Sequence, residues 1–186
     1  SNALIINQCD RNEYKEFIID NNIIRIIYSK ERGLSKSRNL AIKNSNADIC
    51  VIADDDVVYD DKAIAIILDA YNKYQDADLI AFDVPSTNSN RQTRSLKEGR
   101  VCFLKSMRIS SFQITFKREA LLAKNIFFNE LFGSGSRYTC GEENILLAEC
   151  LKKGSKMYYV SKRIGIVHHK QSQWYTGKED PNILKA

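Results

Sequence analysis

Three consecutive aspartates, Asp54, Asp55 and Asp56, follow the apolar stretch of residues 48–53. Carboxylates packed this closely repel one another, and burial at the end of a strand makes the repulsion costly unless a cation neutralises it. A divalent ion with oxygen ligands is the natural partner, and Mg²⁺ or Mn²⁺ would also bridge the phosphates of a diphosphate substrate. The alternative is that the aspartates are turn and helix-capping residues, although a cap needs only one of them.

Further polar side chains stand in adjacent pairs along the sequence. They include a basic and an amide residue after a glycine, two adjacent acids before an apolar stripe, and two adjacent histidines followed by an indole. These residues are Arg38 and Asn39, Glu142 and Glu143, His168 and His169, and Trp174.

Each of these residues also has a purely structural interpretation. Thr139 and Glu142 have the spacing of a capping box, and acids in the first turn of a helix favour its dipole. Glu143 alone is typical of a solvated helix residue, and a histidine at a strand end is more often a surface residue than a ligand. Trp174 could stack on a sugar or base, or cover the core.

The elements that position these residues follow from the periodicity of the apolar positions. Strands alternate with helices in the first half, which predicts an α/β fold with a mostly parallel, doubly wound central sheet flanked by helices. The alternation at 110–116 predicts an antiparallel or edge strand with one wet face in the second half. We expect strands over 4–7, 23–28, 48–53, 78–84, 110–116, 157–160 and 164–167, and helices over 13–20, 35–43, 60–74, 118–124 and 142–153.

Ligands of such sheets bind beyond the carboxyl ends of the strands, where the three aspartates are expected. Here the sequence resembles the family 2 glycosyltransferases of GT-A fold. Those proteins carry a G-x-x-x-A-R-N-x-G segment, a core strand ending in a D-x-D motif, a G-E-D segment that opens a helix, and a histidine after the last strands. The matching segments are GLSKSRNLA at 33–41, ADICVIADDD at 47–56, GEENILL at 141–147 and the histidines at 168–169.

The resemblance implies a metal and donor site at the aspartates. Asp56 would be the direct metal ligand with Asp54 beside it, and Asp54 or Asp55 would lie near the donor ribose or sugar. His168 or His169 would reach the metal or the diphosphate. The implied cofactor is Mn²⁺ or Mg²⁺.

The resemblance also implies the residues that act on the two substrates. Arg38 and Asn39 would lie near the nucleotide or diphosphate. Glu143, in place of the family's aspartate, would be the catalytic base. Glu142 would contact the acceptor beside it, with Trp174 on the acceptor side.

The sequence departs from the family at its beginning. Residues 4–8 resemble the family's second strand, with Asn7 and Gln8 where paired acids normally lie near the base, so Asn7 is the candidate for base recognition. The family's first strand, with its Pro-x-Tyr/Phe-Asn segment, has no counterpart. We therefore expect a single GT-A-like domain over 4–186 that lacks this strand, with residues 1–3 a remnant of an expression tag.

The function implied is transfer of a sugar from a nucleotide sugar, a UDP-sugar in the first instance, to an acceptor hydroxyl with inversion. The acceptor would be a glycan or a lipid-linked molecule in polysaccharide or glycolipid synthesis. One alternative is a non-catalytic GT-A-like module that binds a nucleotide or a partner. Another is a Mg²⁺-binding receiver domain, which the clustering of the acids and the antiparallel second half disfavour.

Composition narrows the class of protein. The chain of 186 residues carries a formal charge of +5, with an acidic first half and a basic second half, as expected where a metal meets a phosphorylated ligand. Its basic residues are scattered, which argues against a nucleic-acid partner. No apolar run reaches the roughly 18 residues that span a bilayer, and the five cysteines lack disulfide or zinc spacing. We expect a cytoplasmic protein, with room for peripheral contact at the inner face of the membrane.

Overall fold

The structure is a computed structural model that describes residues 2–88, 93 and 95–168. The described chain packs into two compact units. The smaller unit contains residues 2–46 and 127–142, and the larger unit contains residues 47–126 and 143–168. None of the helices within the described ranges is both long and apolar enough to cross a membrane.

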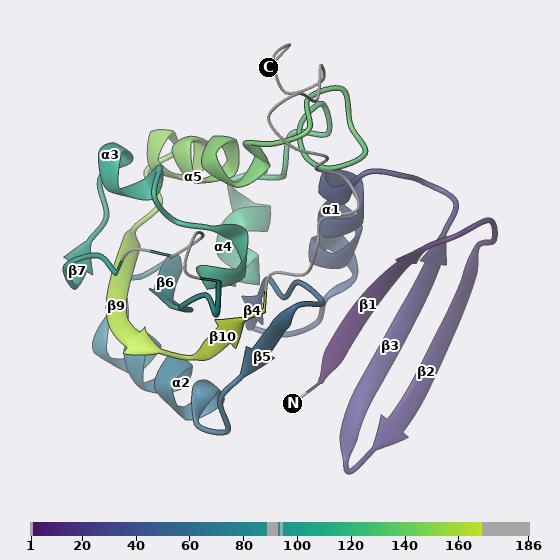
Figure 1. Cartoon of the computed structure of the whole chain (residues 1–186), viewed down its shortest axis with the longest axis horizontal. Helices are drawn as coiled ribbons and strands as arrows, with labels where there is room; N and C mark the ends of the chain where they lie inside the picture. The colour runs from purple at the N-terminus through teal and green to yellow at the C-terminus, as the bar shows by residue number, and fades with distance from the viewer. Residues whose placement is uncertain (1, 89–92, 94, 169–186) are drawn as a thin grey trace. The chain divides into compact units, whose positions relative to one another are not determined.

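The smaller unit is built on a three-stranded sheet (Figure 1). Strand β3 (Asn22–Ser29) lies in the middle, parallel to β1 (Ala3–Gln8) and antiparallel to β2 (Glu13–Ile19). Helix α1 (Leu34–Asn44) follows and packs near β1. Arg25 of β3 donates to the backbone carbonyl of Asn44 at the end of α1, which ties this helix to one face of the sheet.

The helix predicted over 13–20 is wrong, because these residues form strand β2. Asp20 and Asn21 have φ angles of 47° and 61°, the left-handed pair that a two-residue hairpin turn requires. Aspartate and asparagine tolerate this region better than other non-glycine residues, and β-branched isoleucines flank the turn on both sides. A hairpin signal therefore outweighs the short helical spacing.

The larger unit contains a five-stranded sheet in the order β4-β8-β6-β9-β7. Strands β4 (Ile49–Val51), β6 (Leu79–Asp83) and β9 (Met157–Arg163) run in one direction. Strands β8 (Ile114–Lys117) and β7 (Gly99–Arg100) run against them. The predicted α/β class with an antiparallel element in the second half is confirmed, and β8 is the inserted antiparallel strand.

Helices cover both faces of this sheet (Figure 1). Helix α2 (Ala63–Lys73) lies on one face, where its Ile67 and Tyr71 join Ile80 and Phe82 of β6 in the core. Helices α4 (Arg118–Ala123) and α5 (Glu142–Lys152) lie on the other, each with buried leucines. The shorter elements are α3 (Phe103–Ser106), the 3₁₀ turn η2 (Ser111–Gln113), and the paired strands β5 (Val57–Tyr59) and β10 (Gly165–Val167).

The wet face predicted for 110–116 is a second error, since β8 lies between two strands and is buried on both faces. Its polar residues are satisfied inside the protein. The Thr115 hydroxyl donates to the Ile80 carbonyl, and the Gln113 amide donates to the Phe82 carbonyl. Polar residues in alternation therefore mark internal hydrogen bonds here, and solvent does not reach them.

Candidate functional site

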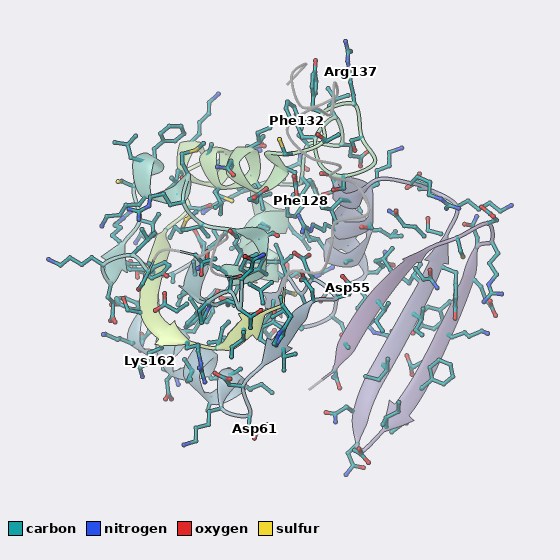
Figure 2. The ribbon with its side chains drawn as sticks, viewed as in Figure 1. Asp55, Asp61, Phe128, Phe132, Arg137 and Lys162 are labelled. Atoms are coloured by element: carbon teal, nitrogen blue, oxygen red, sulfur yellow. The ribbon has the colours of Figure 1, made fainter. Side chains whose placement is uncertain are left out.

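Asp54, Asp55 and Asp56 occupy the turn that joins β4 to β5 in the larger unit, where Figure 2 labels Asp55. Asp54 and Asp56 are half-buried and Asp55 is exposed. The backbone N–H of Val57 donates to the Asp54 carbonyl at 3.3 Å, which closes the turn. The three carboxylates therefore follow the end of a sheet strand, as the sequence predicted.

The Asp54 carboxylate is held by its neighbours. The Ser111 hydroxyl donates to Asp54 Oδ2 at 3.2 Å. Burial, and then the negative charge of Asp54, raise the pKa of Tyr59, whose hydroxyl donates to the Ile52 carbonyl. A fixed carboxylate close to a neutral phenol is an anionic point of defined position, which suits the binding of a cation.

His168 lies next to Asp56 because of strand pairing. Strands β5 and β10 are antiparallel, with Val57 opposite Val167. The residue before Val57, Asp56, therefore lies opposite the residue after Val167, His168. The backbone N–H of His168 donates to the Asp56 carbonyl at 2.8 Å. The ladder thus brings together two residues 112 positions apart in the chain. We call Asp54, Asp56 and His168 the acid–histidine corner, in which the backbone of His168 lies next to that of Asp56.

The residues of this corner fit a hard divalent cation that arrives with phosphate ligands. Within the described ranges, no group of three or more acids, histidines or cysteines is placed to hold a metal ion by itself. Mg²⁺ is commonly bound by one or two carboxylates plus substrate phosphates, and Mn²⁺ accepts the same oxygen donors together with imidazole. Asp54 and Asp56 supply two half-buried carboxylates, and His168 lies exposed beside Asp56. His169 and Trp174 lie outside the described residues.

Glu143 stands in the first turn of α5, half-buried, in the larger unit. Leu146, Leu147 and Cys150 are buried along the same helix and fix its orientation against the sheet. Asn144 donates from its side chain to the Met107 carbonyl at 3.3 Å, which ties the first turn to the segment after α3. The backbone that carries Glu143 is therefore held against the sheet.

Arg38 and Glu142 form a buried ion pair within the smaller unit. Arg38 Nη1 lies 2.9 Å from Glu142 Oε1, and the side chain of each is only 9% exposed. The Arg38 guanidinium also lies 5.3 Å from the centre of the Phe128 ring. Both charges are therefore paired inside the protein. The capping-box interpretation of Glu142 did not include Arg38 as its partner.

The rest of the buried face of α1 holds the backbone of the loop at 127–141. Asn39 donates to the Phe128 carbonyl at 2.9 Å and accepts from the Phe128 N–H at 2.8 Å. The Ser35 hydroxyl donates to the Phe132 carbonyl at 2.6 Å, and α1 begins after Gly33 without a side-chain cap. A Cβ at Gly133, which has a φ of +101°, would lie 3.1 Å from Ser35 Oγ. The loop is thus packed closely against α1.

These contacts between α1 and the loop at 127–141 were not predicted from the sequence, although a signal was present. Ser35, Arg38, Asn39 and Ile42 follow the i, i+3, i+4, i+7 spacing of a buried helix face. Three of the four residues are polar, which predicts that the face meets backbone groups or charges that have no other partner.

Asn7 lies exposed near the end of β1, beside a hollow of the smaller unit. The hollow has a volume of about 430 Å³ and is lined by Asn7, Cys9, Asp10, Arg11 and Tyr28. The Arg11 guanidinium lies 4.4 Å from the centre of the Tyr28 ring. An amide beside an aromatic ring is a combination that can bind the edge and face of a base.

Comparison with known proteins identifies a family. The sequence model described as glycosyl transferase family 2 matches residues 4–138, which is more than half of the chain. No curated protein matches the chain significantly.

Solved structures give the fold. S. aureus TarS 1–349 in complex with UDP-GlcNAc superposes with a TM-score of 0.67 at 14% identity, over 81% of this chain and 44% of that chain. The same TarS fragment in complex with UDP gives a TM-score of 0.65 at 14% identity, over 79% of this chain and 44% of that one. The chain thus spans less than half the length of these proteins, and the predicted GT-A-type fold is confirmed.

Proposed function

The chain belongs to glycosyl transferase family 2, and from this premise we propose that it transfers a sugar from a nucleoside-diphosphate sugar to an acceptor hydroxyl. The observation that carries the proposal is the acid–histidine corner, in which the pairing of β5 with β10 sets His168 beside Asp56. The corner offers oxygen and nitrogen donors for a divalent ion at the end of a sheet strand, where α/β folds bind phosphorylated ligands.

The proposed donor is a UDP-sugar. Its support is the likeness in fold to TarS structures that contain UDP-GlcNAc or UDP, together with the family match. The hollow beside Asn7, with the ring of Tyr28, supplies the groups we assign to the base. The acceptor we propose is a glycan or a lipid-linked glycan in polysaccharide or glycolipid synthesis. We assign the reaction to the cytoplasm, at the inner face of the membrane.

In the proposed mechanism, Asp56 and Asp54 would hold Mn²⁺ or Mg²⁺, with His168 beside them. When bound, the ion supplies positive charge that stabilises the departing nucleoside diphosphate. Asp55, the exposed member of the turn, is assigned to the donor ribose or sugar. Ser111 keeps the Asp54 carboxylate in place through its hydrogen bond.

Glu143 is the proposed general base. It would accept the proton of the acceptor hydroxyl while the acceptor oxygen forms a bond to the anomeric carbon. The bond from that carbon to the diphosphate oxygen breaks in the same step, and its electron pair leaves with the diphosphate. Attack from the side opposite the leaving group inverts the anomeric configuration.

We propose that Arg38, Asn39 and Glu142 are positioning residues. Their internal contacts hold the loop at 127–141, which leads directly into the helix that carries Glu143. Through this loop Glu142 would shape the acceptor side. A direct contact of Arg38 or Asn39 with the diphosphate would need their present contacts to be shared with the ligand.

Donor hydrolysis tests the proposal. We expect the chain to release UDP slowly from a UDP-sugar in the presence of Mn²⁺, and Asp56→Asn to lower that release by about 10²–10³-fold because the developing negative charge loses its counter-ion. The matched control is Asp61→Asn, an exposed aspartate in the turn before α2, which should leave the rate unchanged.

Two outcomes would count against the proposal. Release that is equal for the unmodified chain and Asp56→Asn would remove the acid–histidine corner from the reaction. Tight binding of the nucleotide without turnover of any nucleotide sugar would instead identify a module that binds nucleotide and does not catalyse transfer.

A further inference from the structure

A cluster of apolar side chains stands in solvent at α3 of the larger unit. Phe103 is 55% exposed, Leu104 is 77% exposed and Met107 is 46% exposed. Figure 1 shows α3 at the rim of this unit, next to α5, in agreement with the hydrogen bond from Asn144 to the Met107 carbonyl. Exposed apolar side chains gathered within five residues are uncommon on the surface of a soluble protein. They are typical of surfaces that bind another protein or a membrane.

The fold holds these side chains outward. Val101 and Ile109, on either side of α3, are each 2% exposed and anchor the segment in the core. The Val101 N–H donates to the Met157 carbonyl, and the Ile109 N–H donates to the Ser106 carbonyl. Because both ends are buried in the core, the short helix between them presents Phe103 and Leu104 to solvent.

Basic residues flank the apolar cluster in the sequence. The basic residues of the segment are Lys97, Arg100, Lys105 and Arg108. Within the described ranges, none of the four forms an ion pair with a carboxylate. The one acid nearby in sequence, Glu98, is bound to Lys73 at 2.6 Å. The segment that carries α3 is therefore positively charged and bears exposed apolar side chains.

We propose that this α3 patch (Phe103, Leu104, Met107 and the four cations) docks the protein on an anionic lipid bilayer. Apolar side chains that protrude between cations can enter the headgroup region while the cations bind acidic headgroups. A protein partner would need a recess that matches a protruding tip. A bilayer surface adapts to it, which favours the membrane. The proposal does not depend on nucleotide-sugar transfer, and the patch residues are not among those assigned to the reaction, although the same segment continues into Ser111, which donates to Asp54.

Helix α2 provides a matched comparison. Its Ile64 and Leu68 are 51% and 49% exposed, close to the values for Phe103 and Met107. Their exposed neighbours are two acids, Asp61 and Asp69, and one cation, Lys62, so this segment lacks the net positive charge of the α3 segment. The two segments have similar apolar exposure and different net charge, so comparing them separates lipid docking from non-specific hydrophobic binding.

Vesicle sedimentation with the full chain tests the proposal. We expect binding to phosphatidylcholine vesicles that contain about one third phosphatidylglycerol, weaker binding at about 0.5 M salt, and little binding to phosphatidylcholine alone. The double variant Phe103→Ser/Leu104→Ser should lower the partition by about tenfold or more because the apolar contact is lost. Ile64→Ser/Leu68→Ser should bind as the unmodified chain does.

A second variant keeps the test independent of folding defects. Leu104→Trp retains an apolar side chain, and its fluorescence should shift to shorter wavelength when anionic vesicles are added. The proposal is overturned if the unmodified chain does not bind anionic vesicles. It is also overturned if the two double serine variants bind these vesicles equally well. It is also overturned if Phe103→Ser/Leu104→Ser abolishes self-association in solution without changing vesicle binding, because the patch would then be a protein interface.

Discussion

Replacing Glu143 by glutamine is expected to lower the rate of sugar transfer to an acceptor by about 10²–10⁴-fold, the usual contribution of a general base. Glutamine keeps the size of the side chain but cannot accept the proton of the acceptor hydroxyl. Binding of the nucleotide and slow hydrolysis of the donor should persist, because neither needs this proton transfer. The measurement is a comparison of acceptor glycosylation with UDP release.

Helix α5 itself offers the control for this variant. Glu149 lies on the same helix and pairs with Lys153 at 2.8 Å, one turn away. Glu149→Gln removes a carboxylate of similar exposure and should leave transfer unchanged. If Glu143→Gln retained more than about one tenth of the activity, the loss would be too small for a general base and another group would have to take the proton.

Replacing Arg38 by methionine is expected to destabilise the smaller unit by about 3–5 kcal/mol, because the buried Glu142 carboxylate is left without its cation. The loss is the second large effect that the structure predicts. Hydrogen exchange measured along the chain should show it as lost protection in α1 and in the loop at 127–141. The exchange of Phe128, whose N–H is bound to Asn39, reports this loop directly.

Two variants separate the buried pair from a general effect of charge. Arg38→Met/Glu142→Leu removes both charges and should recover most of the lost stability, since a buried pair can be replaced by apolar groups at little cost. Asp10→Asn removes the exposed pair with Arg32 in the same unit and should change exchange little. Equal losses in the single and double variants would show that packing, and not the unpaired charge, is responsible.

The acid turn could be predicted from sequence because its signals are local. The apolar run at 48–53, the three aspartates after it and the helix from Glu142 each depend on residues adjacent in the chain. Strand and helix positions follow from such runs, as the confirmed strands β3, β6 and β10 show. The placement of Asp54–Asp56 at the end of a strand needed no long-range information.

The contacts that define the candidate site required the structure. Nothing in the sequence indicates that Val57 pairs with Val167, which is what brings His168 to Asp56. The pairing of Arg38 with Glu142 spans 104 positions and gives two residues expected to contact ligands a partner inside the protein. Long-range register decides such contacts, and a single sequence does not encode it in a readable pattern.

Titration calorimetry with UDP tests the proposed metal-bridged donor site most directly. We predict that the chain binds UDP in the presence of Mn²⁺, and that binding is lost when the metal is chelated or when Asp56 is replaced by asparagine. The ion links the carboxylate to the diphosphate, so both changes remove the same bridge. Absence of UDP binding with Mn²⁺, or binding that is identical without the metal and in Asp56→Asn, would contradict this prediction.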